Sequence, residues 1–230
     1  MKTNKLLIPF AVAALAIASL SASANTITID TPSGSTLGGL PISAEAVFTT
    51  SANDLKITLR NFQNDPTSVI QSISGLSFAL TSGQTSGSLL SSSGMERTIA
   101  ANGTYVNGAT VAAGWSLTGL KLNDLGAAGP THTLIGGPNG SNIYGNGNGS
   151  IDGNGAHNPF LAGDVTFDLF IQGVNVDSSI KDVLFFFGTE NGTSVGSGPP
   201  TRNVPDGGMT LMLLGAGLSG LGLVRKTVKK

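Results

Sequence analysis

The segment ISAEAVFTTSANDLKITLR, residues 42–60, decides the fold class of this chain. Apolar side chains occupy every second position through 42–48 and again through 55–59, and most positions between them are polar. This period of two is typical of a β-strand that buries one face. The residues Ser51-Ala52-Asn53-Asp54 separate the two halves and predict a hairpin turn. We therefore expect two neighbouring antiparallel strands.

The same pattern returns along the chain. Large apolar residues fall on every second position through 76–80 and 165–171, whereas the run 183–187 is apolar on both faces. A run of this second kind is typical of a central strand that is covered on both sides. No segment of the central part has the pattern of a long amphipathic helix. These observations predict an all-β protein, an antiparallel, jelly-roll-like β-sandwich that spans residues 25–191.

The composition of the central part excludes several classes of partner and chemistry. Residues 25–204 hold twelve of the thirteen acidic residues but only six of the twelve basic ones, so this part carries a net charge of −6. Such a surface repels nucleic acid and disfavours phosphate ligands. The chain has no cysteine, which excludes disulfides, thiol chemistry and thiolate metal sites. Without its terminal segments the chain keeps about 180 residues, the size of one ordinary domain.

The N-terminus has the parts of a secretory signal peptide. Two lysines precede the apolar residues 6–20, and Ala22-Ser23-Ala24 has the form that signal peptidase reads. We expect export by the general secretion machinery and cleavage after Ala24, which would leave Asn25 as the first mature residue. The alternative is that residues 1–24 remain as an N-terminal membrane helix.

The C-terminus combines an apolar segment with a basic tail. Residues 209–224 form a predominantly apolar run of 16 residues. A helix of this length spans ~24 Å, slightly less than a ~30 Å hydrocarbon core. The cations of the tail can extend to the headgroups and should hold the tail in the cytoplasm. We expect a single transmembrane helix at 209–224 with residues 25–204 outside; the alternative is a buried core helix. The basic tail consists of Arg225, Lys226, Lys229 and Lys230.

A five-residue motif, Val204-Pro205-Asp206-Gly207-Gly208, lies directly before the apolar segment. The motif, the apolar run and the basic tail together resemble the PEP-CTERM group of sorting signals, in particular its Val-Pro-Asp-Ser-Gly variant (VPDSG-CTERM). Gly207 stands where that variant has Ser. The resemblance implies recognition by an exosortase, a membrane-embedded enzyme of Gram-negative bacteria that make exopolysaccharide. It also implies that the inner membrane holds the precursor only transiently.

The central part resembles the exported domains of exosortase substrates. Three short motifs carry this resemblance: an alternating hairpin in 46–61, Gly-Ala-His-Asn-Pro-Phe at 155–160, and Phe-Phe-Phe-Gly-Thr at 185–189. That group of domains has no established activity to transfer to this chain. The resemblance therefore supports the fold and the destination, and implies no reaction.

These observations favour an exported component of the cell surface or of an exopolysaccharide-rich extracellular matrix, without catalytic residues and without a cofactor. Exopolysaccharide of a biofilm is the expected surrounding of such a protein. One alternative is a secreted carbohydrate-binding or adhesive module, which would use Trp115, Tyr144 and the loop 136–160. Another alternative is a surface protein that stays anchored in the membrane.

The segment 136–155 predicts a long loop, because thirteen of its twenty residues are Gly or Asn and such a stretch should build no core. Asp152 and Asn154 bring oxygen ligands close together, as in a calcium loop, but the segment lacks the closing Glu of an EF-hand. We expect a solvated loop, with calcium binding as the alternative. The nearby His157 predicts either a structural side chain or a ligand contact. The Gly-, Ser- and Pro-rich residues 192–203 predict a flexible linker.

Overall fold

Strands form almost all of the regular structure of the described residues. The computed structural model describes residues 24–126, 129–130, 132–153, 157–189, 194–199 and 201–203. Within these ranges the chain is all-β apart from one short 3₁₀ helix, η1 (Val69–Gln71), which confirms the predicted class. The strands are β1 (Asn25–Asp30), β2 (Thr36–Leu37), β3 (Leu40–Pro41), β4 (Ala44–Ser51), β5 (Asp54–Asn61), β6 (Ile73–Leu80), β7 (Ser88–Ile99), β8 (Tyr105–Val111), β9 (Ser116–Thr118), β10 (Lys121–Asn123), β11 (Leu125–Gly126), β12 (Gly129–Pro130), β13 (Leu134–Ile135), β14 (Phe160–Phe170), β15 (Ile180–Phe187), β16 (Ser194–Gly196) and β17 (Thr201–Asn203).

One large sheet contains thirteen of these strands, and nearly all of its pairs are antiparallel. Its longest path runs β16-β15-β6-β13-β14-β5-β4-β1-β17, and β7 continues from β14 to β8. The two-residue strand β13 pairs with β14 in the one parallel ladder among the described strands, and its Leu134 pairs with Ile73 of β6. This short strand therefore joins two parts of the sheet that otherwise lie apart.

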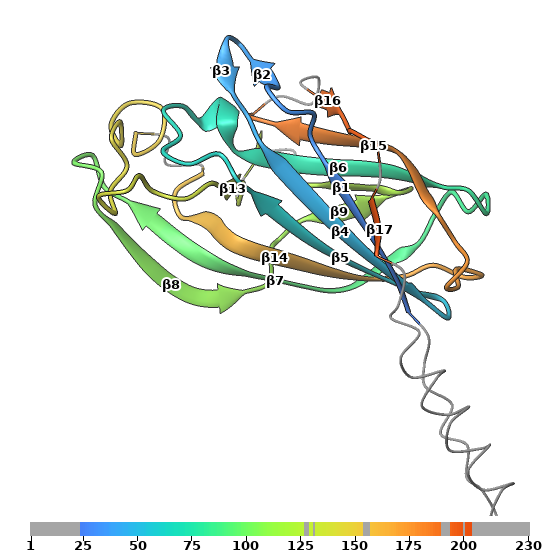
Figure 1. Cartoon of the computed structure of the whole chain (residues 1–230). Coiled ribbons are helices and arrows are strands. Elements are labelled where there is room, and N and C mark those ends of the chain that lie inside the picture. Colours follow the sequence, from blue (N-terminus) through green and yellow to red (C-terminus); the bar gives the residue numbers. More distant parts are fainter. Residues whose placement is uncertain are drawn as a thin grey trace, which may run out of the picture.

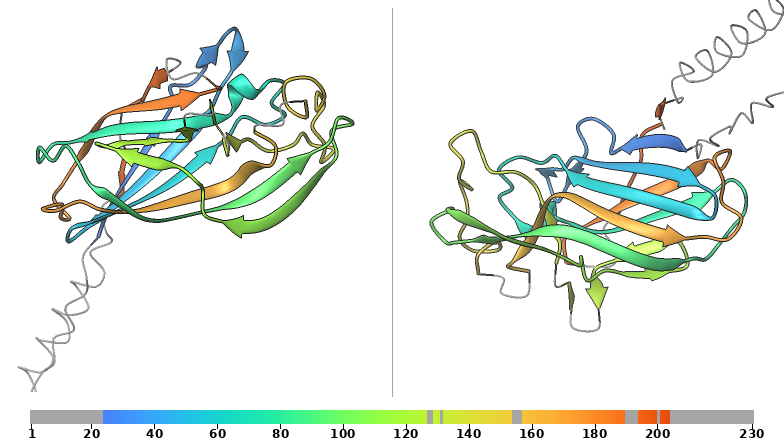
Figure 2. Two further views of the ribbon diagram at one scale, coloured as in Figure 1. Left: turned by 180° about the vertical axis from the view of Figure 1, so that it is seen from behind. Right: turned by 90° about the horizontal axis from the view of Figure 1, so that it is seen from below.

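The sheet folds over itself, so that its two parts face each other (Figures 1 and 2). Strands β1, β4, β5, β14, β7 and β8 form one layer, and β6 and β15 run in the other. The ring of Phe48 on β4 meets the ring of Phe78 on β6 edge-on, with centroids 5.4 Å apart. The main core lies between the layers, because burying both inner faces removes their apolar side chains from water.

The hairpin predicted from residues 42–60 is present as β4 and β5. Their register pairs Ser51 with Asp54 and leaves two residues in the turn. The second of these, Asn53, has a φ of 59°, a left-handed conformation that asparagine adopts more readily than most residues. Alternate residues of both strands are buried, as the period of two predicts, and Phe48 and Ile57 are both fully buried.

The apolar run 183–187 differs in part from its prediction. Phe185 and Phe187 of β15 are fully buried, but Leu184 is 37% exposed. Strand β15 pairs with the long β6 on one side and only with the three-residue β16 on the other. The run therefore lies next to an edge of the sheet, and its outer face is only partly covered.

A second, smaller core involves the Gly- and Asn-rich segment. Tyr144 and Ile151 from this segment are buried together with Ile99, Ile135, Phe160 and Ala162. The expectation that this segment builds no core is therefore wrong. Its glycines allow the close approach: a Cβ on Gly147 would lie 2.7 Å from the Cα of Gly103. Two apolar side chains are enough because strands and loops of other regions supply the rest of the cluster.

The linker prediction also needs correction. Residues 194–196 form β16, which pairs with β15, and residues 201–203 form β17, which pairs with β1. The first and last of the described strands along the chain, β1 and β17, therefore lie side by side (Figure 1). The predicted signal peptide before Ala24, the motif 204–208, the apolar segment 209–224 and the basic tail lie outside the described residues. Within the described ranges, no helix has the length and apolar character needed to cross a membrane.

Candidate functional site

A pocket of about 490 Å³ opens where β5, β7 and β14 meet the loop after β13. Its lining mixes charged, amide and apolar groups, which is the composition of a site for a polar ligand with an apolar face. The lining residues are Arg60, Asn61, Phe62, Asn64, Arg97, Ile135, Gly137, Pro138, Gly163 and Asp164.

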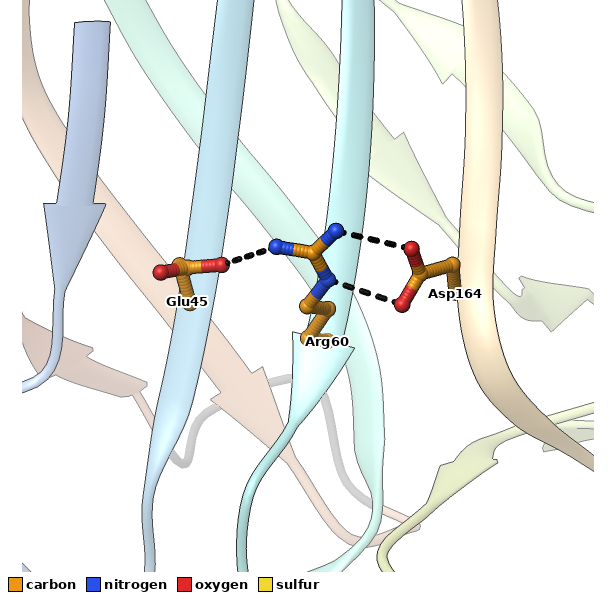
Figure 3. Close-up of polar contacts among 3 residues, drawn as sticks. All are labelled: Glu45, Arg60 and Asp164. Carbon is orange, nitrogen blue, oxygen red and sulfur yellow. Dashed lines mark hydrogen bonds and ion pairs between the residues drawn. The ribbon is translucent and has the colours of Figure 1, made fainter.

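An ion-pair network crosses three strands at the pocket wall, as Figure 3 shows. The Nε and Nη2 of Arg60 donate to the two carboxylate oxygens of Asp164 at 2.7 and 2.8 Å, and its Nη1 donates to Oε1 of Glu45 at 2.6 Å. This two-pronged geometry fixes the guanidinium plane. The hydrogen bond from Arg60 holds the pKa of Asp164 below its usual range. Arg60 is therefore already neutralised, and Asp164 faces the pocket as a carboxylate.

A bulge in β14 shapes this wall. The register of β14 against β7 shifts between Ala162 and Thr166, where β14 has two more residues than its partner. Gly163, within the bulge, has a φ of 73°, which favours glycine. The bulge places Gly163 and Asp164 in the pocket lining. Bulges commonly redirect side chains beside binding sites.

Arg97 on β7 is buried to an unusual degree for an arginine, with 8% exposure. Its Nε donates to Asn107 at 2.8 Å, its Nη1 donates to the hydroxyl of Tyr144 at 2.9 Å, and its guanidinium lies 4.3 Å from the ring centroid of Tyr105. The Tyr144 hydroxyl in turn donates to the carbonyl of Gly136 at 2.9 Å. None of the ion pairs found among the described residues includes Arg97.

Phe62 supplies the aromatic surface of the pocket. It follows the last residue of β5 and is 50% exposed, although its backbone is held by a hydrogen bond from its N–H to the carbonyl of Ser43 at 2.8 Å. The opposite side is anchored as well, because the N–H of Asp65 donates to the carbonyl of Gly137 at 2.8 Å. An exposed ring on a fixed backbone can pack against the face of a ligand with little loss of entropy.

The structure buries the three residues that the sequence offered as alternative ligand contacts. Trp115 is 4% exposed, donates its Nε1–H to the carbonyl of His132 at 2.9 Å and packs on Phe167. Tyr144 and His157 are 1% and 3% exposed. Their burial contradicts the alternative in which Trp115 and Tyr144 contact a surface ligand, and His157 is buried as well.

The structure does not decide whether the loop around Asp152 binds calcium. The N–H of Asp152 donates to the carbonyl of Gly147 at 2.9 Å, which closes a turn in the loop, and Asn154 lies outside the described residues. Among the residues that the structure describes, no three His, Asp or Glu side chains gather as a metal site. Calcium binding, the alternative to the expected solvated loop, stays untested.

The pocket residues were not among those predicted from the sequence. Arg60 and Asp164 are 104 residues apart, and only the pairing of β5 with β14 brings them together. The available signal for Phe62 was an aromatic residue directly after a strand, which by itself is common on protein surfaces.

Comparison of this chain with protein-family models, with curated proteins and with solved structures finds no match.

Proposed function

We propose that this protein is an exported, non-catalytic component of the cell surface or extracellular matrix, released by processing at both ends. One observation carries the proposal: the folded sheet fits between the two predicted processing sites. Strand β1 begins at Asn25, directly after the predicted signal-peptidase site, and β17 ends at Asn203, directly before the motif that begins at Val204. Removal of both terminal segments would leave every described strand in place.

The two ends of the predicted mature chain lie next to each other, which supports the same proposal. Because β1 pairs with β17, the mature chain would begin and end on adjacent strands, as Thr26 pairs with Asn203. Both predicted processing sites would then lie at one edge of the domain. We propose for the domain itself the finer classification as a jelly-roll-like β-sandwich, which its two facing layers support.

The pocket chemistry does not favour glycoside hydrolysis. Glycoside hydrolysis uses two carboxyl groups about 5–10 Å apart, one of them protonated to act as the acid. Asp164 is the one carboxyl group among the described lining residues, and Arg60 lowers its pKa. A carboxyl group held in its charged form is a poor proton donor at neutral pH.

The test is deletion of the exosortase in a producing host. We expect precursor to accumulate in the membrane fraction and the released form to disappear, and an inactive exosortase variant should give the same result. The competing possibility, a permanently anchored surface protein, predicts the same membrane-bound species with and without the enzyme. That outcome would contradict the proposal.

A carbohydrate-binding or adhesive module is the second candidate, and the exposed Phe62 in the pocket favours it. Its binding residues would be those of the pocket, since Trp115 and Tyr144 are buried. Loss of binding to matrix polysaccharide in Phe62→Ala, with retention in Trp115→Phe, would support this candidate. Equal binding by both variants and the parent would contradict it.

A further inference from the structure

Arg97 carries a buried charge that no ion pair among the described residues compensates. Its side chain is nine-tenths buried, yet no carboxylate among the described residues pairs with it. Removing a charge from water is costly unless an opposite charge or a full set of hydrogen bonds replaces the water. The neutral oxygens of Asn107 and Tyr144 and the ring of Tyr105 compensate for this only in part.

Some N–H groups of the Arg97 guanidinium also have no hydrogen-bond acceptor among the described residues. An arginine side chain has five N–H groups, and the described residues accept one bond from Nε and one from Nη1. They offer no acceptor to Nη2. Because Arg97 lines the pocket, these donors are available to a ligand there. The packing against Tyr105 and the bond to Tyr144 hold the guanidinium in place before any ligand arrives.

The other residues that line the pocket indicate which further groups the ligand should carry. Phe62 offers an apolar ring face, and Asp164, which stays a carboxylate, can accept hydrogen bonds from hydroxyl groups. Asn64 adds an amide at the same pocket. An apolar face, several hydroxyls and one negative charge are the features of a pyranose ring that bears a carboxylate. A more highly charged group fits poorly, because Asp164 and Glu45 lie beside the pocket and the domain carries excess negative charge.

We propose that this pocket binds an acidic sugar unit of the uronate type. The carboxylate of the sugar pairs with the guanidinium of Arg97, the ring packs against Phe62, and a ring hydroxyl donates to Asp164. The inference rests on the proposed function in one respect: the proposed matrix location is the reason for choosing a sugar as the molecule that carries the carboxylate. The pocket itself, and the lack of an ion-pair partner for Arg97 among the described residues, do not depend on that location.

The test is titration calorimetry of the purified full-length chain in detergent, with a tetragalacturonate as the probe. The matched control is the same oligosaccharide as its methyl ester, which has the same ring faces and no charge. We expect the acid to bind at least tenfold more tightly than the ester, with binding weakened by added salt. Equal affinity for acid and ester would overturn the proposal. Tighter binding of a peptide that ends in a free carboxylate would overturn the assignment to a sugar.

Substitutions of pocket residues test whether the probe binds at this pocket. Arg97→Gln should abolish the preference for acid over ester, and Phe62→Ala should weaken both probes. The matched control is Phe170→Ala, since Phe170 is also exposed, at 45%, but lies at the far end of β14 from Gly163. If Arg97→Gln does not fold, Phe62→Ala and Asn64→Ala still decide the question, because both change exposed or half-buried positions. Binding that survives both of these variants unchanged would contradict the proposal. Such a failure leaves terminal processing unaffected, so it is distinguishable from failure of the proposed function.

Discussion

The two cores of this protein are built by different means. The main core lies between two layers of strands, and its residues alternate along those strands, as Phe48 and Ile57 do in β4 and β5. The second core takes Tyr144 and Ile151 from a segment with no periodic pattern. Hydrogen bonds from distant residues hold that segment: Asp65 accepts from the N–H of Gly145 at 2.6 Å, and the hydroxyl of Tyr105 donates to Asn142 at 2.6 Å. The comparison teaches that regular alternation builds a scaffold, whereas the pocket region depends on a few specific bonds.

The largest expected effect is in the main core. Phe48→Ala should lower the free energy of unfolding by about 3–5 kcal/mol, because Phe48 is fully buried and the change removes its contact with Phe78 and leaves a cavity. Urea unfolding followed by circular dichroism measures the change. The control Phe170→Ala, at a 45% exposed ring, should change stability by less than about 1 kcal/mol. Similar losses in both variants would show that the layers do not pack as described.

The second prediction separates the two cores. Tyr144→Phe keeps the ring but removes the hydroxyl that accepts from Arg97 and donates to the buried carbonyl of Gly136. Two polar groups lose a partner, which should cost about 1–3 kcal/mol. Hydrogen exchange should accelerate in residues 139–147, where the N–H of Tyr144 bonds to the carbonyl of Gly103, and stay slow in β4 and β5. Equal acceleration in both regions would mean that the two cores form a single cooperative unit.

These two regions also show what sequence could predict. The hairpin 42–60 was predictable because each strand carries its own pattern, and the side chains at 55, 57 and 59 face one core whatever partner they find. Arg60, Arg97 and Asp164 were not, because their roles depend on which strands pair and on the bulge at Gly163. The burial of Tyr144 could not be read from a Gly- and Asn-rich segment, since its partners lie as far away as Arg97. The same holds for 194–203, where β16 and β17 pair without an alternating apolar signal.

A smaller effect is expected at the pocket wall. Arg60 lowers the pKa of Asp164, so this ion pair stabilises the fold above pH 3.8 and loses its effect as the pH falls through the lowered pKa. Asp164→Asn should therefore cost less than about 1 kcal/mol at neutral pH, because the pair is largely exposed. Thermal unfolding from pH 7 to pH 2 measures the difference, which should vanish at the acidic end. A difference that is constant across this range would show that the ion pair is not its cause.

The smallest effect has the opposite sign. A hydrogen bond with Asp54 raises the pKa of Asp168 above its usual value, and burial has a smaller effect in the same direction. A raised pKa favours the fold while the carboxyl group is protonated, and this stabilisation is lost as the pH rises through the raised pKa. Asp168→Asn should therefore raise the melting temperature slightly at neutral pH and leave it unchanged below pH 3.8. A lower melting temperature at neutral pH would contradict the proximity of the two carboxyl groups.

Both cores lie between Asn25 and Asn203, and the proposed function depends on the chain being cut just outside that interval. Intact mass spectrometry of the protein recovered from a producing host tests this most directly. We predict a species that begins at Asn25 and ends within 204–208, apart from any group that the sorting enzyme attaches. A recovered protein whose mass still includes Arg225–Lys230 would contradict the proposal.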